Sequence, residues 1–87
     1  MDWKGLKKER IDLAYPLLII KGSNGLLSCG YLNIDICDKN DEACAIVFGV
    51  KSHDDMLNAE LKAVTRKAGK LGLRVGMKGQ EALEILR

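Results

Sequence analysis

Cys29 is the residue of this chain best suited to carry out chemistry, because a cysteine thiolate is a strong nucleophile. It follows a short apolar segment and precedes Gly30, which predicts a strand end where the backbone turns sharply into a helix. A thiol at a helix N-terminus is activated by the helix dipole. Free cysteines are also among the most buried residues, so a small core residue followed by a turn glycine is the simpler interpretation.

The single histidine, His53, is the obvious general base for such a thiol. It also follows Ser52, whose side chain suits a helix N-cap, and an exposed histidine is ordinary in that position. Nothing in the sequence brings His53 to Cys29, so a catalytic pair of these two residues is a hypothesis, in which Asn33 could also assist. We therefore lean against an enzymatic activity.

Two groups of residues are candidates for binding rather than catalysis. Cys29, Gly30 and Asn33 form a candidate ligand site around the expected strand end. A candidate anion site precedes the last expected helix, where exposed N–H groups and cations would meet. Its glycine spacing matches neither a P-loop nor a dinucleotide fingerprint, and turn chemistry also explains it. Its residues are Arg74, Gly76, Lys78 and Gly79.

The sequence predicts no metal and no cofactor. Three cysteines, Cys29, Cys37 and Cys44, are spaced by eight and seven residues with no CxxC motif, and one histidine does not complete a zinc set. The acidic segment 38–42 lacks the glycine and glutamate that an EF-hand requires. An odd number of cysteines at these spacings favours a reducing, cytoplasmic location over a disulfide scaffold. The apolar run Leu17–Ile20 is too short for a signal peptide or a membrane span, so we expect no membrane partner.

Charge is distributed unevenly along the chain. The net charge of +2 does not by itself indicate a nucleic-acid partner. Residues 33–60 contain seven acidic and two basic residues, whereas residues 61–78 contain six basic residues and no acidic one. This asymmetry could steer an anionic ligand or pair one copy of the chain with another. Lys62, Arg66 and Lys70 would form a basic ridge on an expected helix, facing either solvent or an acidic partner.

With 87 residues, the chain is expected to form one α+β domain over residues 1–87. We predict a mostly antiparallel sheet of about four strands with helices packed on one face, concentrated in the C-terminal half. The segments 17–20 and 26–29 form a hairpin across the turn 22–25. The remaining expected strands cover 3–10 and 43–50, and the expected helices cover 52–58, 60–71 and 79–86. Residues 31–39 fit either a strand, since their apolar residues alternate with polar ones, or a short helix capped by Asn33.

The segment NGLLSCGYLN, residues 24–33, resembles the signature G-x-x-M-C-G-Y-L-N of the YunC-like family of bacteria and archaea. Three further segments are similar in the same order: AIVFGVK (45–51), DMLNA (55–59) and LGLRVGMKGQEAL (71–83). Ser28 departs from the pattern, since the family often has methionine there. The resemblance implies a helix after the Cys-Gly-Tyr-Leu-Asn stretch. The family is a domain of unknown function, so the resemblance implies no catalytic residue.

These observations together predict a small cytoplasmic module that self-associates as a homo-oligomer and binds a small-molecule ligand or a protein partner. A small core makes oligomerisation a reasonable means of stabilisation. The alternative is a thiol-dependent enzyme that uses Cys29 as its nucleophile.

Overall fold

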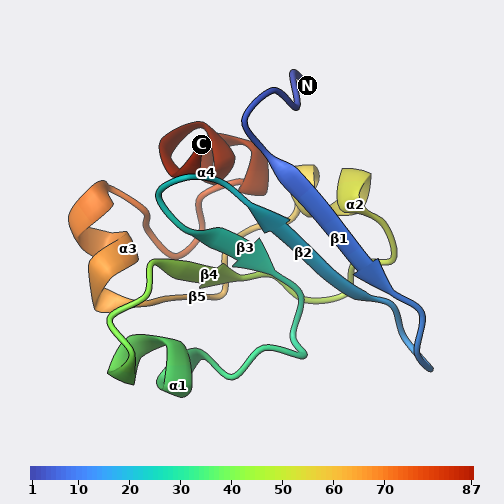
Figure 1. Cartoon of the computed structure of the whole chain (residues 1–87), viewed down its shortest axis with the longest axis horizontal. Coiled ribbons are helices and arrows are strands. Elements are labelled where there is room, and N and C mark those ends of the chain that lie inside the picture. The colour runs from blue at the N-terminus through green and yellow to red at the C-terminus, as the bar shows by residue number, and fades with distance from the viewer.

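A computed structural model describes all 87 residues as one five-stranded sheet with four short helices (Figure 1). The strands lie side by side in chain order, β1-β2-β3-β4-β5. Their bounds are β1 Lys7–Ile11, β2 Leu17–Lys21, β3 Leu26–Ser28, β4 Cys44–Ile46 and β5 Ala63–Val64. The helices are α1 Ile34–Lys39, α2 His53–Asn58, α3 Arg66–Leu71 and α4 Gly79–Leu86. The predicted α+β class with a mostly antiparallel sheet is confirmed.

The sheet contains one parallel pair among antiparallel neighbours. β1 and β2, β2 and β3, and β4 and β5 run antiparallel, whereas β3 and β4 run parallel, with Leu27 opposite Ala45. The predicted hairpin of β2 and β3 is confirmed, and its turn is closed by the Gly22 N–H, which donates to the Gly25 carbonyl at 2.8 Å. A parallel pair requires a crossover between its strands, and α1 lies within that crossover.

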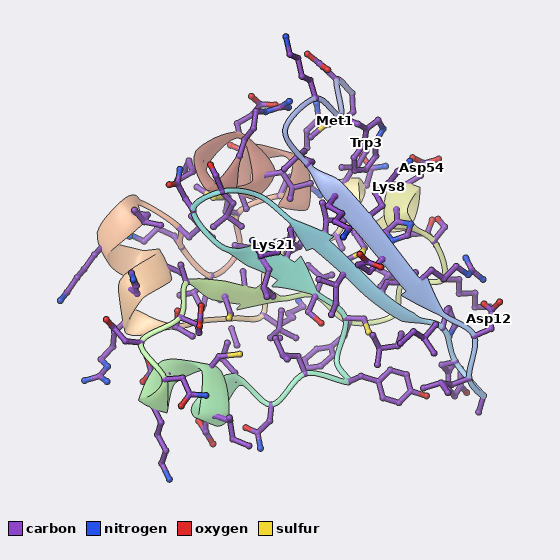
Figure 2. The ribbon with its side chains drawn as sticks, in the orientation of Figure 1. Met1, Trp3, Lys8, Asp12, Lys21 and Asp54 are labelled. Atoms are coloured by element: carbon purple, nitrogen blue, oxygen red, sulfur yellow. The ribbon has the colours of Figure 1, made fainter.

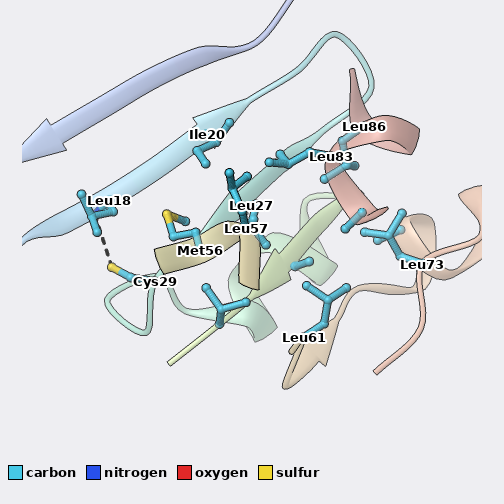
Figure 3. Close-up of a cluster of buried hydrophobic side chains, with 14 of the residues drawn as sticks. Leu18, Ile20, Leu27, Cys29, Met56, Leu57, Leu61, Leu73, Leu83 and Leu86 are labelled. Carbon is cyan, nitrogen blue, oxygen red and sulfur yellow. Dashed lines mark hydrogen bonds between the residues drawn. The ribbon is translucent and has the colours of Figure 1, made fainter. Parts of the chain in front are cut away.

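One face of the sheet carries the aliphatic core (Figure 3). Alternate residues of the strands point to opposite faces, so Leu18, Ile20, Leu27 and Ala45 share this face. Helices α2 and α4 cover it with apolar side chains. The buried residues that they and the adjacent loops contribute are Met56, Leu57, Leu61, Leu73, Ala82, Leu83 and Leu86.

Helix α1 covers the opposite face of the sheet. The sequence, by contrast, predicts helices on one face only. Its buried residue, Cys37, lies beside the Cys44 thiol of β4, and Cys44 points away from the aliphatic core. The parallel crossover explains this position, because the chain must leave β3 and return beside it on one side of the sheet. Burial on both faces makes β4 fully buried, in agreement with its uninterrupted apolar sequence.

Most helix ends follow the expected capping residues. Asn33 Oδ1 accepts the N–H groups of Asp35 and Ile36 at 2.9 and 3.4 Å, which confirms the predicted helix after the Cys-Gly-Tyr-Leu-Asn stretch. Ser52 caps α2 in the same way, and Gly72 ends α3 in the left-handed conformation. The last helix, α4, begins at Gly79 and ends at Leu86, as predicted.

The expected helix over residues 60–71 is wrong in its first half. Residues 60–65 are extended, and α3 begins only at Arg66. The Lys62 N–H donates to the Ile46 carbonyl and the Leu61 N–H to the Met77 carbonyl, so pairing with β4 and with the segment before α4 outweighs the helical pattern. Lys62 is therefore not on one helix with Arg66 and Lys70, and the predicted basic ridge does not form.

The uneven charges are partly paired within the chain. Asp38 of α1 accepts the backbone N–H of Arg66 at 2.9 Å and lies 3.2 Å from its guanidinium. The backbone N–H of Arg66 holds the pKa of Asp38 below its usual value of 3.8. This carboxylate faces the N-terminus of α3, where the helix dipole favours a negative charge. The other contacts between the two regions are Asp41–Lys67 and Glu60–Lys78, both at 4.0 Å.

The N-terminal segment folds back over the edge strand. Trp3 lies against Lys8 of β1, with the ammonium 4.5 Å from the ring centroid (Figure 2). The strand expected over residues 3–10 begins later, at Lys7, and all of its side chains are exposed. Its position at the sheet edge is confirmed, and its charged residues suit an unpaired edge.

Thr65 joins β4, the loop before it and α3 through one hydroxyl group. Its side chain is 2% exposed, and Oγ1 donates to the Glu42 carbonyl at 2.6 Å. The same oxygen accepts the N–H groups of Cys44 in β4 and Ala68 in α3 at 3.1 and 3.2 Å. One buried hydroxyl therefore holds the start of β4 against the first turn of α3.

We predict that Thr65→Val destabilises the protein by about 2–4 kcal/mol, because valine keeps the shape but leaves buried N–H and C=O groups without partners. Urea unfolding followed by circular dichroism measures this change. The matched control is Thr65→Ser, which keeps the hydroxyl and should cost only about 1 kcal/mol for the lost methyl group. Equal losses in the two variants would show that packing of the methyl group, not the hydroxyl, matters at this position.

Candidate functional site

A cavity of about 390 Å³ lies at one edge of the sheet, where three loops meet. The first loop precedes β2, the second follows β3 and the third follows β4. Its lining is mostly apolar and contains one charged residue. The lining residues are Tyr15, Pro16, Cys29, Gly30, Tyr31, Phe48, Gly49, Val50 and Lys51.

The position of this cavity follows from the topology of the sheet. Both β3 and β4 end at this edge because they are parallel. After β3 the chain passes to the face covered by α1, and after β4 it passes to the face covered by α2 and α4. The two connections thus diverge and leave a crevice between them. In sheets with parallel strands, ligands bind at such a point, outside the carboxyl ends of the strands.

The loops approach each other closely at Gly30. A Cβ atom on Gly30 would lie 2.6 Å from two ring carbons of Phe48, which is shorter than any normal contact. The aromatic ring therefore rests directly on the Gly30 backbone. Glycine at this position is what allows the third loop to reach over the second and form one wall of the cavity.

Aromatic residues are concentrated here. The chain contains only four, and three of them line the cavity: Tyr15, Tyr31 and Phe48. Their exposed fractions are 69%, 48% and 60%. No aromatic residue belongs to the buried core. Large rings gain stability when they are buried, so exposing three of them around one cavity suits a surface that binds something.

Cys29 forms part of the cavity floor and is nearly buried, with 5% of its surface exposed. Its Sγ accepts the Leu18 N–H at 3.4 Å (Figure 3) and lies 3.8 Å from the Pro16 carbonyl. The helix expected next to this thiol begins only at Ile34, behind the Asn33 cap. The dipole of α1 therefore does not act at Cys29.

The structure brings together only part of the predicted sites. Cys29 and Gly30 both line the cavity, whereas Asn33 caps α1 and is not a lining residue. His53 is engaged elsewhere, with its Nε2 2.8 Å from the Glu9 carbonyl of β1. A carbonyl only accepts, so this contact requires the proton on Nε2.

The residues of the predicted anion site are occupied by groups of the chain itself. Arg74 donates to the carbonyls of Gly69 and Leu73 at 2.8 and 2.7 Å, and the Lys78 ammonium donates to the Asn58 carbonyl at 3.2 Å. The N–H of Gly79 donates to the Ala59 carbonyl, and that of Gly76 to the Leu61 carbonyl. These contacts hold the loop before α4 in place.

Sequence reasoning missed most of the cavity wall. Tyr15, Tyr31, Phe48 and Lys51 belong to three loops whose meeting depends on the pairing of β3 with β4. One available signal was the scarcity of aromatic residues combined with their position beside expected strand ends.

A second depression, between the N-terminal segment and the end of α4, is lined only by polar residues and glycine.

The other two cysteines lie away from the cavity. Cys37 and Cys44 are buried and not disulfide-bonded. Burial, the neighbouring Cys37 thiol and the Glu42 carboxylate raise the pKa of Cys44 from 9.0 to about 12.

No cluster of three or more histidine, cysteine, aspartate or glutamate residues is arranged to hold a metal ion. The longest helix, α4, has eight residues, and no helix could cross a membrane.

Comparison with known proteins places the chain in a family. Residues 28–86 match the Domain of unknown function (DUF1805). The uncharacterised protein YunC of Bacillus subtilis (strain 168) is 34% identical over 70 residues, which cover 76% of this chain and 69% of YunC. The chain belongs to the DUF1805 family. The resemblance to YunC-like proteins is thereby confirmed.

A solved structure of similar sequence shares the DUF1805 fold described here. The crystal structure of TA1206, a protein of unknown function from Thermoplasma acidophilum, superposes with a TM-score of 0.82. The two chains are 30% identical, and the match covers 94% of this chain and 93% of TA1206. The β3–β4 crossover and its loops thus lie within a fold found in another organism.

For this DUF1805 chain we predict that all three cysteines react with iodoacetamide more slowly when folded than in urea, with Cys44 the slowest. Mass spectrometry of alkylated peptides at pH 8 measures each site. As the pH rises from 9 toward 12, unfolded Cys44 loses its proton before folded Cys44 does, so the free energy of unfolding should fall over this range. Faster alkylation of Cys29 in the folded protein would instead indicate an activated thiol.

Proposed function

We propose that the protein is a cytoplasmic binding module that holds a small, largely apolar ligand in the cavity at the end of the β3–β4 pair. The single observation that carries this proposal is the gathering of Tyr15, Tyr31 and Phe48 around that cavity. The volume of about 390 Å³ falls within the range of roughly 300–1,000 Å³ that small-molecule sites occupy. The unpaired, buried cysteines support a reducing compartment.

The composition of the cavity also supports binding rather than catalysis. Catalysis by a thiol needs a base within hydrogen-bond reach, and no histidine or carboxylate is among the lining residues. The only imidazole, His53, contacts β1 instead. The thiol-dependent enzyme is therefore the weaker alternative, favoured only by the presence of Cys29 in the cavity floor.

A titration with a flat aromatic fragment tests the binding proposal. We expect indole, added to the ¹⁵N-labelled protein, to shift the NMR signals of the Gly30, Phe48, Gly49 and Val50 amides with a Kd of about 1 mM. Phe48→Ala removes one aromatic wall and should raise this Kd by about five- to tenfold.

The matched control for this titration is Val75→Ala. Val75 is an exposed apolar residue, 63% accessible, in the loop between α3 and α4, and does not line the cavity. Its truncation should leave the Kd unchanged. Absence of amide shifts around the cavity, or equal affinity in Phe48→Ala and the parent protein, would contradict the proposal.

Self-association is the second part of the proposed function. Ile11 and Leu13 are exposed apolar residues, 56% and 52% accessible, at the β1–β2 turn, and they could be covered by a second copy of the chain. We expect light scattering at micromolar concentration to give at least twice the chain mass of 9.6 kDa. Leu13→Lys should return the protein to monomers, whereas Val75→Lys should not. A monomeric parent protein would remove this part of the proposal.

A further inference from the structure

The geometry points to a planar aromatic molecule bearing one carboxylate group as the class of ligand for this cavity. This inference rests on the proposed binding function and specifies its ligand. It is drawn from three features of the lining: the charge at its rim, the backbone groups of its loops and the arrangement of its aromatic rings.

The cavity presents one positive charge and no negative charge. Lys51 is the only charged residue among the nine that line it, and its ammonium group forms no ion pair within the chain. One charged group that contacts the Lys51 backbone is already paired. Arg10, which donates to the Lys51 carbonyl at 3.4 Å, is paired with Asp12 at 2.8 Å. A single anionic group on a ligand would therefore complement Lys51.

One carboxylate lies close to this loop from the side of α2. Asp55 Oδ2 accepts the backbone N–H of Lys51 at 3.0 Å, and Asp55 is not a lining residue. This contact fixes the Lys51 backbone as the chain enters α2 and leaves the ammonium on its flexible stem. Because Asp55 lies close to the same loop, its carboxylate partly offsets the positive charge that Lys51 offers to an anion.

The loop backbones supply hydrogen-bond donors. The N–H groups of Gly30 and Tyr31, after β3, and of Gly49 and Val50, after β4, donate no hydrogen bond to any group of the chain. Both loops also form the cavity wall. Unpaired donors on two facing loops suit a ligand that brings acceptor oxygens, and a carboxylate provides two.

The aromatic rings select for a flat ligand. Aromatic groups bind one another through stacked or edge-to-face contacts, and Tyr15, Tyr31 and Phe48 offer three rings around a single cavity. Phe48 rests on Gly30, so its ring has a defined position beside the N–H groups of the second loop. A ligand ring packed here would place its carboxylate toward those N–H groups and Lys51.

The test compares two probes of nearly the same shape by NMR titration of the labelled protein: indole-3-acetate, and the neutral indole-3-acetamide, in which an NH2 group replaces one carboxylate oxygen. We expect the acid to bind about three- to tenfold more tightly than the amide. Lys51→Gln should reduce this preference to the part that the backbone N–H groups supply, without changing the Kd of the amide, and Lys51→Arg should preserve it in full. Lys70→Gln, which removes an exposed charge from α3, is the control and should leave the preference intact.

The outcomes separate this inference from the function on which it rests. Equal affinity for the two probes, or a preference of the same size in Lys51→Gln, would overturn the carboxylate inference while leaving a small-ligand site. Failure of both probes to shift the cavity amides in the parent protein would overturn the binding function as well. An acid preference that depends on the charge at Lys51 supports both.

Discussion

The parallel pairing of β3 with β4 is the constraint on which the rest of the structure depends. It places the ends of both strands at one edge of the sheet and forces the chain through a crossover, which carries α1 to the second face. The next connection leaves β4 toward the opposite face, where α2 and α4 build the core. A wholly antiparallel sheet would have its strand ends at alternate edges, and the cavity loops would not meet.

Aliphatic and aromatic side chains occupy different parts of this structure. The core is built from aliphatic residues, methionine and cysteine, which pack well in the thin space between a sheet and short helices. Three of the four aromatic residues, which could have supplied more apolar area to so small a domain, lie instead around the cavity. The protein thus lacks the stability that burying these rings in the core would add. Such a loss is common where an exposed surface serves binding.

Local sequence signals determined the elements, and long-range pairing determined where they meet. The β2–β3 hairpin, the Asn33 and Ser52 caps, the Gly72 terminus and α4 could all be predicted because each depends on neighbouring residues. Residues 60–65 could not, because their extended form depends on β4 and on the segment before α4. The cavity could not be predicted either, since three loops distant in sequence form it.

The position of Cys29 at the junction of the ladder and the cavity explains the Cys-Gly pair in structural terms. Its N–H donates to the Leu18 carbonyl at 3.0 Å, as in a regular antiparallel pair. The reciprocal N–H of Leu18 is accepted by the thiol at 3.4 Å. The Cys29 carbonyl is thereby left to accept the Ser28 hydroxyl and the Leu32 N–H, which bend the chain out of the sheet.

A sulfur atom is suited to accept the Leu18 N–H in place of a backbone carbonyl. It is a soft, weak acceptor that tolerates burial among apolar groups better than a hydroxyl does. Gly30 then lets the bent chain pass beneath the Phe48 ring. The pair therefore ends a strand and starts the cavity wall in two residues. This role accounts for the burial of the thiol without catalysis.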